Sequence, residues 1–133
     1  MIFDHERLDV YRVSIEFVAW VGALFEGPLA GKRQAAMGQL DRASTSIALN
    51  IAEGNGKRSV KDRCRYVDIA RGSAFESAAC LDVFVARRLL TSEDVGPGKA
   101  LLKRVVGMLT KWTQALSGDL APASASRRKT GWR

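Results

Sequence analysis

The sequence predicts an all-α fold, an antiparallel up-down-up-down four-helix bundle, from three observations. Apolar residues recur at three- and four-residue steps through four long segments, as they do on one side of an α-helix. The chain has only three prolines, and each stands where a helix can stop or start: Pro28, Pro97 and Pro122. Its 133 residues, 47% of them hydrophobic, suit one domain with a buried core.

The first helix is expected at residues 7–26 and carries two apolar stripes. One stripe consists of Leu8, Tyr11, Ile15, Val18, Gly22 and Phe25. A helix of a monomeric bundle needs one apolar face, and large exposed apolar patches usually mark interfaces. We therefore expect the chain to associate with itself through the second stripe, which contains Val10, Val13, Phe17, Trp20 and Leu24. The alternative is that this helix is buried more centrally within its own chain.

The second and third helices are expected at residues 32–53 and 60–90. The core line of the second helix is Leu40, Ala43, Ile47 and Ile51. The sequence Gly54-Asn55-Gly56 predicts a left-handed cap at its end. Ser59 is a favourable N-cap for the third helix. The middle of the third helix is rich in Ala, Gly and Ser, which allows a neighbouring helix to approach closely.

The fourth helix is expected at residues 97–117, after a connection that starts at Thr91. The bundle then occupies residues 1–117. From Gly118 onward the chain is rich in Ala, Ser and basic residues and has no periodicity. We therefore expect residues 118–133 to form a disordered basic tail.

The chain has a net charge of +7, and part of this excess lies in the tail. A second basic cluster spans residues 57–71, at the start of the third helix, where the helix N-terminus itself favours anions. Cations gathered in this way bind phosphates with little regard to sequence. The candidate nucleic-acid-binding residues, for RNA or DNA, are Lys57, Arg58, Lys61, Arg65, Arg127, Arg128 and Lys129. The alternative is an ordinary solvated helix face.

Catalytic chemistry has few candidates in this sequence. His5 is the single histidine, which argues against a catalytic triad, a multi-histidine metal site or a di-iron bundle site. Glu53 and Glu76 are conceivable as an acid–base pair, but structural roles are more common for such carboxylates. We therefore expect no enzyme activity, no cofactor and no metal.

The compartment is expected to be the cytoplasm. Cys64 and Cys80 lie sixteen residues apart on one predicted helix, about 24 Å along its axis, too far for a disulfide. The most apolar stretch, residues 10–25, is interrupted by Arg12 and Glu16, so no membrane contact is expected. The N-terminus does not have the pattern of a signal peptide.

Two spaced motifs resemble the signature of the bacterial four-helix-bundle proteins first noticed in intervening sequences of 23S rRNA genes. The first motif is QLDRA at residues 39–43 followed by SIALNIAEG at residues 46–54. The second is IARGSAFE at residues 69–76. Leu8 and Tyr11 also suit the first helix of that family. The resemblance covers roughly residues 7–117.

The resemblance implies a four-helix bundle that assembles as a ring-shaped homopentamer. Most members have no established activity, so no catalytic residue is transferred. A related branch, the accessory variability proteins of diversity-generating retroelements, is a basic pentamer that works with a reverse transcriptase and nucleic acid. The motif residues suit contacts between helices or subunits, and they are Arg42, Asn50, Glu53, Gly54, Gly72, Ser73 and Glu76.

These observations favour a non-enzymatic oligomeric scaffold that binds nucleic acid or a nucleic-acid enzyme. The alternative is a purely structural or protein-interaction module that does not contact nucleic acid.

Overall fold

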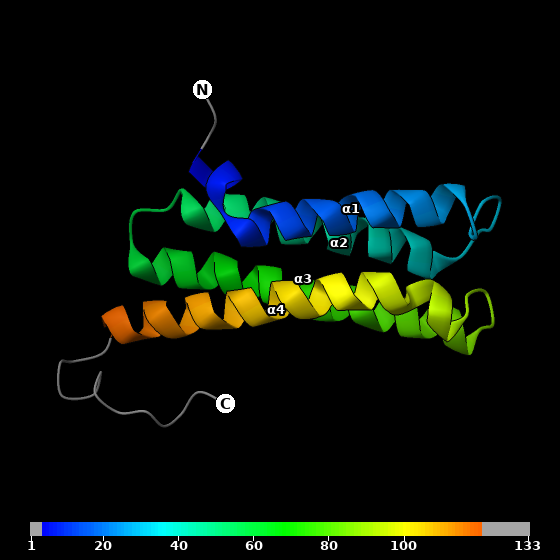
Figure 1. The fold of residues 1–133 in the computed structure, drawn as a ribbon. Coiled ribbons are helices and arrows are strands. Elements are labelled where there is room, and N and C mark those ends of the chain that lie inside the picture. The colour runs from blue at the N-terminus through cyan, green and yellow to red at the C-terminus, as the bar shows by residue number, and fades with distance from the viewer. Residues whose placement is uncertain (1–3, 121–133) are drawn as a thin grey trace.

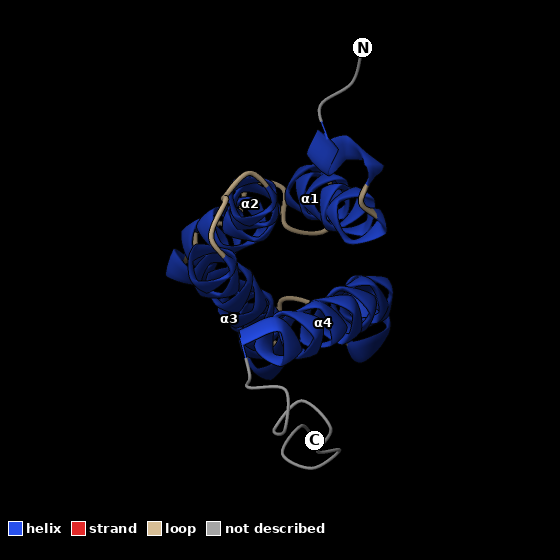
Figure 2. Ribbon diagram, turned by 90° about the vertical axis from the view of Figure 1, so that its left-hand side faces the viewer, coloured by secondary structure: helices blue, strands red, loops and turns tan. Residues whose placement is uncertain are grey.

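In the computed structural model, which describes residues 4–120, a short 3-10 helix at Asp4–Arg7 (η1) precedes four α-helices. These are α1 at Asp9–Glu26, α2 at Ala35–Asn55, α3 at Val60–Ala86 and α4 at Ser92–Leu120. Successive helices run in opposite directions (Figure 1). Each packs against the next, and α4 returns to α1 to close the bundle (Figure 2). The described residues contain no strand, which confirms the all-α prediction.

The apolar stripe of α1 that the sequence assigned to an oligomer interface lies inside the bundle, so that assignment is wrong. Val10, Val13, Phe17 and Leu24 are all buried within the chain. Trp20 is half-buried, and its ring stacks on that of Phe17 with a centroid distance of 5.8 Å. α1 contacts both α2 and α4. The second stripe is therefore the face that α1 turns to the core, whereas Ile15 of the first stripe is 42% exposed.

The turn between α2 and α3 is tighter than the sequence suggested. α2 continues to Asn55 instead of ending at residue 53. Gly54 is buried inside the helix, and a Cβ at this position would lie 3.1 Å from the Cβ of Tyr66 on α3. Glycine therefore allows the two helices to approach. The predicted left-handed cap is wrong, because Gly56, the C-cap, has a φ of −82° in the right-handed region.

Small hydroxyl side chains connect α2 and α3 near the middle of the bundle. Ser73 Oγ donates a hydrogen bond to Ser46 Oγ at 2.9 Å, and Asn50 Nδ2 donates to the same oxygen at 3.0 Å. Ser77 Oγ donates to the backbone oxygen of Ser73 at 2.9 Å. These bonds satisfy polar groups where the helices pack closely. Asn50 and Ser73 from the two sequence motifs thus share one network.

α3 ends at Ala86, before the predicted end at residue 90, because the chain turns through a Schellman motif. Arg88 has a φ of 60°, the left-handed conformation in which glycine is usual. The N–H of Leu89 donates to the oxygen of Phe84 at 2.9 Å, and the N–H of Arg88 donates to that of Val85 at 3.0 Å. This end lacks the glycine that usually marks such a turn, so it could not be predicted from the residue types.

α4 is longer than predicted at both ends. It begins at Ser92 because Thr91 and Asp94 form a capping box: Asp94 N–H donates to Thr91 Oγ1 at 3.0 Å, and Thr91 N–H donates to Asp94 Oδ2 at 2.8 Å. Pro97, the predicted start, lies inside the helix. α4 reaches Leu120, so the predicted tail boundary at residue 118 is also wrong. The rest of that tail lies outside the described residues.

The crossing of α4 over α1 depends on another glycine. Gly98 is buried, and a Cβ added there would lie 2.8 Å from Trp20 Cε3 and even closer to Cζ3 and Cη2 of the same ring. The indole therefore occupies the space that any other residue at position 98 would need. None of the described helices combines the length and the hydropathy that spanning a lipid bilayer requires.

Candidate nucleic-acid interface

The end of the bundle where α2 turns into α3 carries the four described cations that the sequence selected. We call this region the basic turn, and its residues are Lys57, Arg58, Lys61 and Arg65. Ser59 Oγ accepts a hydrogen bond from the N–H of Asp62 at 3.0 Å, which confirms Ser59 as the N-cap of α3. Arg63 Nε donates to the backbone oxygen of Lys57 at 2.7 Å and ties the turn to α3.

Lys57 is the least available of the four cations. Its Nζ lies 3.1 Å from Glu53 Oε2 and 5.1 Å from the centroid of the Tyr66 ring. The hydrogen bond to Glu53, followed by the attraction of Tyr66, raises the pKa of Lys57. The ammonium group therefore stays charged, but a carboxylate partly offsets that charge.

The other three cations of the basic turn are exposed. Among the described side chains of residues 4–118, Arg58 and Lys61 make no ion pair or hydrogen bond. The Arg65 guanidinium lies 5.2 Å from the centroid of the Tyr66 ring and donates a long hydrogen bond, 3.4 Å, to its hydroxyl oxygen. The ring of Tyr66 thus makes cation–π contacts with two cations of the basic turn, Lys57 and Arg65. The remaining candidates, Arg127, Arg128 and Lys129, lie outside the described residues.

The outer face of α3 carries an apolar surface that the sequence analysis missed. We call it the α3 face; its residues recur at steps of three or four, and its large apolar members are Ile69, Phe75 and Val83. Phe75 is 51% exposed, with the guanidinium of Arg71 5.2 Å from its ring centroid. The exposed small residues Gly72 and Ala79 lie between the large ones. The same three- and four-residue spacing would have revealed this face in the sequence.

A groove of 380 Å³ between α3 and α4 adjoins the α3 face. Phe75 forms one wall, and the other lining side chains are mainly apolar, including Ala78, Leu102 and Val106. The cationic side chains of Lys99 and Lys103 also line the groove, and Lys99 forms an ion pair with Asp82 of α3. Apolar surface thus continues from the outside of α3 into the α3–α4 seam.

The remaining motif residues occupy separate positions. Glu53 binds Lys57 and lines a shallow hollow with His5 and Leu49, whereas Glu76 is exposed midway along α3 and does not line that hollow. The two carboxylates therefore do not form a pair there. Arg42 is exposed on α2, and it lines another shallow hollow of that helix together with Asn50. In the described part of the chain, no group of three or more His, Cys, Asp or Glu residues could hold a metal ion.

Cys64 and Cys80 both lie on α3 and are free. Burial, and to a smaller extent the nearby carboxylate of Asp68, raises the pKa of the Cys64 thiol. Burial followed by the charge of Glu76 raises the pKa of Cys80 in the same way. Neither environment is that of an activated thiolate, which needs a depressed pKa.

The fold and the sequence both have relatives. The chain resembles the crystal structure of a protein of unknown function from the S23 ribosomal protein family of Bacteroides thetaiotaomicron VPI-5482, with a TM-score of 0.73 and 23% identity over 78% of this chain and 97% of the other. None of the curated proteins compared with the chain is similar to it. Residues 6–111 match the sequence model of the 23S rRNA-intervening sequence proteins. The chain therefore belongs to the 23S rRNA-intervening sequence protein family.

Proposed function

We propose that the protein is a non-enzymatic, oligomeric scaffold of the cytoplasm that binds nucleic acid through the basic turn. The observation that carries this proposal is the pair Arg58 and Lys61, which are exposed at the N-terminus of α3 and have no ion-pair partner among the described side chains of residues 4–118. Their cations and the helix dipole favour the same ligand, a phosphate group.

The double variant Arg58→Ala/Lys61→Ala should weaken binding of mixed-sequence RNA and DNA by about tenfold or more at low salt. Loss of two phosphate contacts should also lower the slope of log affinity against log salt by about 1.4–1.8. Fluorescence anisotropy titrations between about 50 and 200 mM salt measure both quantities.

The matched control is Lys32→Ala/Arg33→Ala, which removes the same charge from exposed positions at the opposite end of the bundle. This control should change affinity much less. If both double variants lost the same affinity, the basic turn would contribute only through the net charge of the protein and would not be a binding site. Absence of binding by the unaltered protein at low salt would overturn the proposal.

We further propose that self-association, as the ring-shaped homopentamer that the family resemblance implies, uses the α3 face. An exposed apolar surface of this kind typically marks an interface. A ring needs two different complementary surfaces on each protomer. The α3 face with its adjoining groove supplies one, and Leu49 on α2, 63% exposed, is a candidate for the second. A ring would repeat the basic turn on every protomer and multiply its charge.

The substitution Phe75→Glu should dissociate the assembly, because it places a charge in the proposed apolar contact. Light scattering at micromolar concentration should give a mass well above 14.5 kDa for the unaltered protein and a mass close to it for the variant. Ile15→Glu is the matched control, since Ile15 is similarly exposed on α1 but lies away from the α3 face. A monomeric unaltered protein would contradict self-association; an unchanged mass for Phe75→Glu would contradict the α3 face.

The second candidate function is a protein-interaction module that does not contact nucleic acid. The exposed Phe75 and the groove beside it support this alternative, because such surfaces suit apolar partners. The salt titrations above discriminate between the two candidates.

A further inference from the structure

The seam between α1 and α4 contains a second cationic site, separate from the basic turn. It is a groove of 460 Å³ with basic side chains on both walls. Arg12 comes from α1, while Lys103, Arg104 and Lys111 come from α4. Two carboxylates, Asp9 and Glu16, also line the groove, so cations exceed anions by two.

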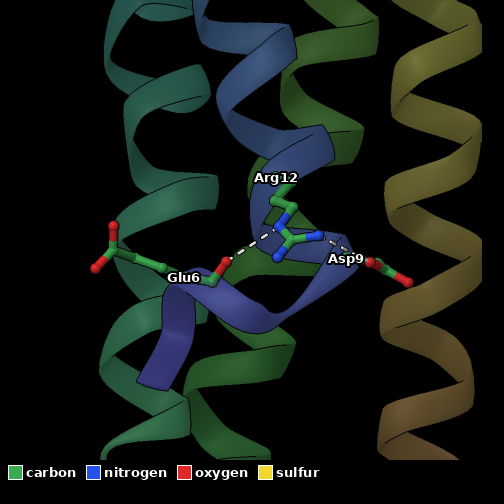
Figure 3. A network of polar contacts seen from close by, with 3 residues as sticks. All are labelled: Glu6, Asp9 and Arg12. Carbon is green, nitrogen blue, oxygen red and sulfur yellow. Dashed lines mark hydrogen bonds and ion pairs between the residues drawn. The ribbon is translucent and has the colours of Figure 1, made fainter. Parts of the chain in front are cut away.

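The two carboxylates offset the cations only weakly. Arg12 lies between the two partners drawn in Figure 3: its Nε donates to the backbone oxygen of Glu6 at 3.1 Å, and Nη1 is 3.8 Å from Asp9 Oδ1. Arg104 Nη1 is 3.9 Å from Glu16 Oε2. These long ion pairs join side chains that are mostly exposed, and such pairs contribute little free energy.

Lys103 and Lys111 have no ion pair with the described side chains of residues 4–118, so their charges are available to a ligand. They lie two helical turns apart on one face of α4, about 12 Å along its axis. From Lys99 to Gly118, both included, the sequence contains four basic residues and no acidic residue. At Gly107, between the two lysines, an added Cβ would meet no atom within 4 Å, so a ligand can come close to the helix.

The remaining lining of the groove is apolar. Val13 of α1 is buried and Met108 of α4 is half-buried, and both lie in the seam between the cationic walls. Cations on two walls over an apolar floor suit a narrow ligand that has charges along its length and apolar parts between them. A single nucleic-acid strand has this chemistry, since its phosphates alternate with sugars and bases.

The position of the groove links it to the proposed binding surface. The start of α1, which lines one end of the groove, lies at the same end of the bundle as the α2–α3 turn (Figure 1), although α1 and α4 are on the opposite side of the bundle from α2 and α3 (Figure 2). We infer that the α1–α4 groove binds the phosphate backbone of a single nucleic-acid strand, without sequence preference, and extends the contact made by the basic turn. This inference rests on the proposed function, because it adds a second site for the same class of ligand.

The test uses the full chain and a labelled oligo(dT) of about 20 nucleotides, with fluorescence anisotropy as the readout. Lys103→Ala/Lys111→Ala should weaken binding about tenfold or more at low salt and lower the salt slope by about 1.4. Lys32→Ala/Arg33→Ala is the charge-matched control. Light scattering should show the same mass for all variants. This check is needed because Lys103 also borders the α3–α4 groove, which adjoins the proposed oligomer interface.

A gain of affinity supplies the second arm of the test. Glu16→Gln removes a carboxylate from the groove and releases Arg104, so it should tighten oligo(dT) binding several-fold and preserve the size of the side chain. A reduction in protein stability does not explain tighter binding, so this outcome separates a site from a structural effect.

The outcomes are distinguishable from those for the basic turn. If Arg58→Ala/Lys61→Ala weakens binding while the groove variants behave like the control, the groove inference is overturned and the proposed function stands. If oligo(dT) does not bind to the unaltered chain, both fail. A duplex of the same length that binds as tightly and loses as much affinity in the groove variant would overturn the assignment of a single strand.

Discussion

Phe17→Ala should lower the free energy of unfolding by about 3–5 kcal/mol, a large share of the stability of an ordinary domain. Phe17 is fully buried in the core and stacks with Trp20, so truncation removes packing that the surrounding helices cannot fully restore. Urea denaturation followed by circular dichroism measures the change. The loss should be the same at different protein concentrations, because the contacts lie within one chain.

The matched substitution is Phe75→Ala, which removes the same side chain from an exposed position. At concentrations where the protein is monomeric, it should change the free energy of unfolding by only about 0.5 kcal/mol. If Phe17→Ala were as mild as Phe75→Ala, Phe17 would not be part of the core. If it instead lowered the oligomeric mass without loss of stability, the original assignment of this stripe to an interface would be restored.

Gly98→Ala should destabilise the protein by about 1–3 kcal/mol, although alanine is the better helix former by about 1 kcal/mol. The added methyl group would overlap the ring of Trp20, and the indole is held by its stacking on Phe17. The bundle must then move α4 away from α1 or rotate the indole out of its packed position. Chemical denaturation gives the size of the loss, and Trp fluorescence reports the environment of the ring.

Gly107→Ala is the control for Gly98→Ala. Gly107 lies in the same helix, but an added Cβ there would meet no atom within 4 Å. This substitution should therefore stabilise the protein by about 0.5–1 kcal/mol through helix propensity alone. Changes of opposite sign in the free energy of unfolding for the two substitutions would establish that the backbone at Gly98 lies close to the Trp20 ring. Stabilisation by both would show that the indole moves aside at little cost.

Much of the fold could be predicted from the sequence because helix periodicity is a local signal. The first helix was expected to end at Glu26, where the structure ends it, and Ser59 was identified as the N-cap of α3. The predicted helix ends were wrong where a residue adopts a conformation unusual for its type or where a capping residue lies outside the expected helix. Arg88 adopts a left-handed conformation that is usual for glycine, so no glycine in the sequence indicates the end of α3. Pro97 suggested a helix start, but the capping box at Thr91 begins α4 earlier.

Only those residues of the candidate site that are close together in the sequence could be predicted. The basic turn comprises neighbours in the sequence, so its cations were visible as a cluster. The α1–α4 groove joins Arg12 to Lys103 and Lys111 across most of the chain, and only the packing of the first helix on the last brings them together. The stripe on α1 was misread for the same reason: periodicity shows that a face is apolar but does not show which helix covers it.

The packing of α1 against α4 also determines when the bundle can close during synthesis. At ~5–20 residues per second, the ribosome needs on the order of ten seconds to extend the chain from the end of α1 to the end of α4. During that interval α2 can pair with α1, but the part of α1 that α4 covers, including Trp20 beside Gly98, still faces solvent. The nascent chain therefore presents an apolar helix that the finished protein hides, and this transient species is the form most exposed to chaperones and to aggregation.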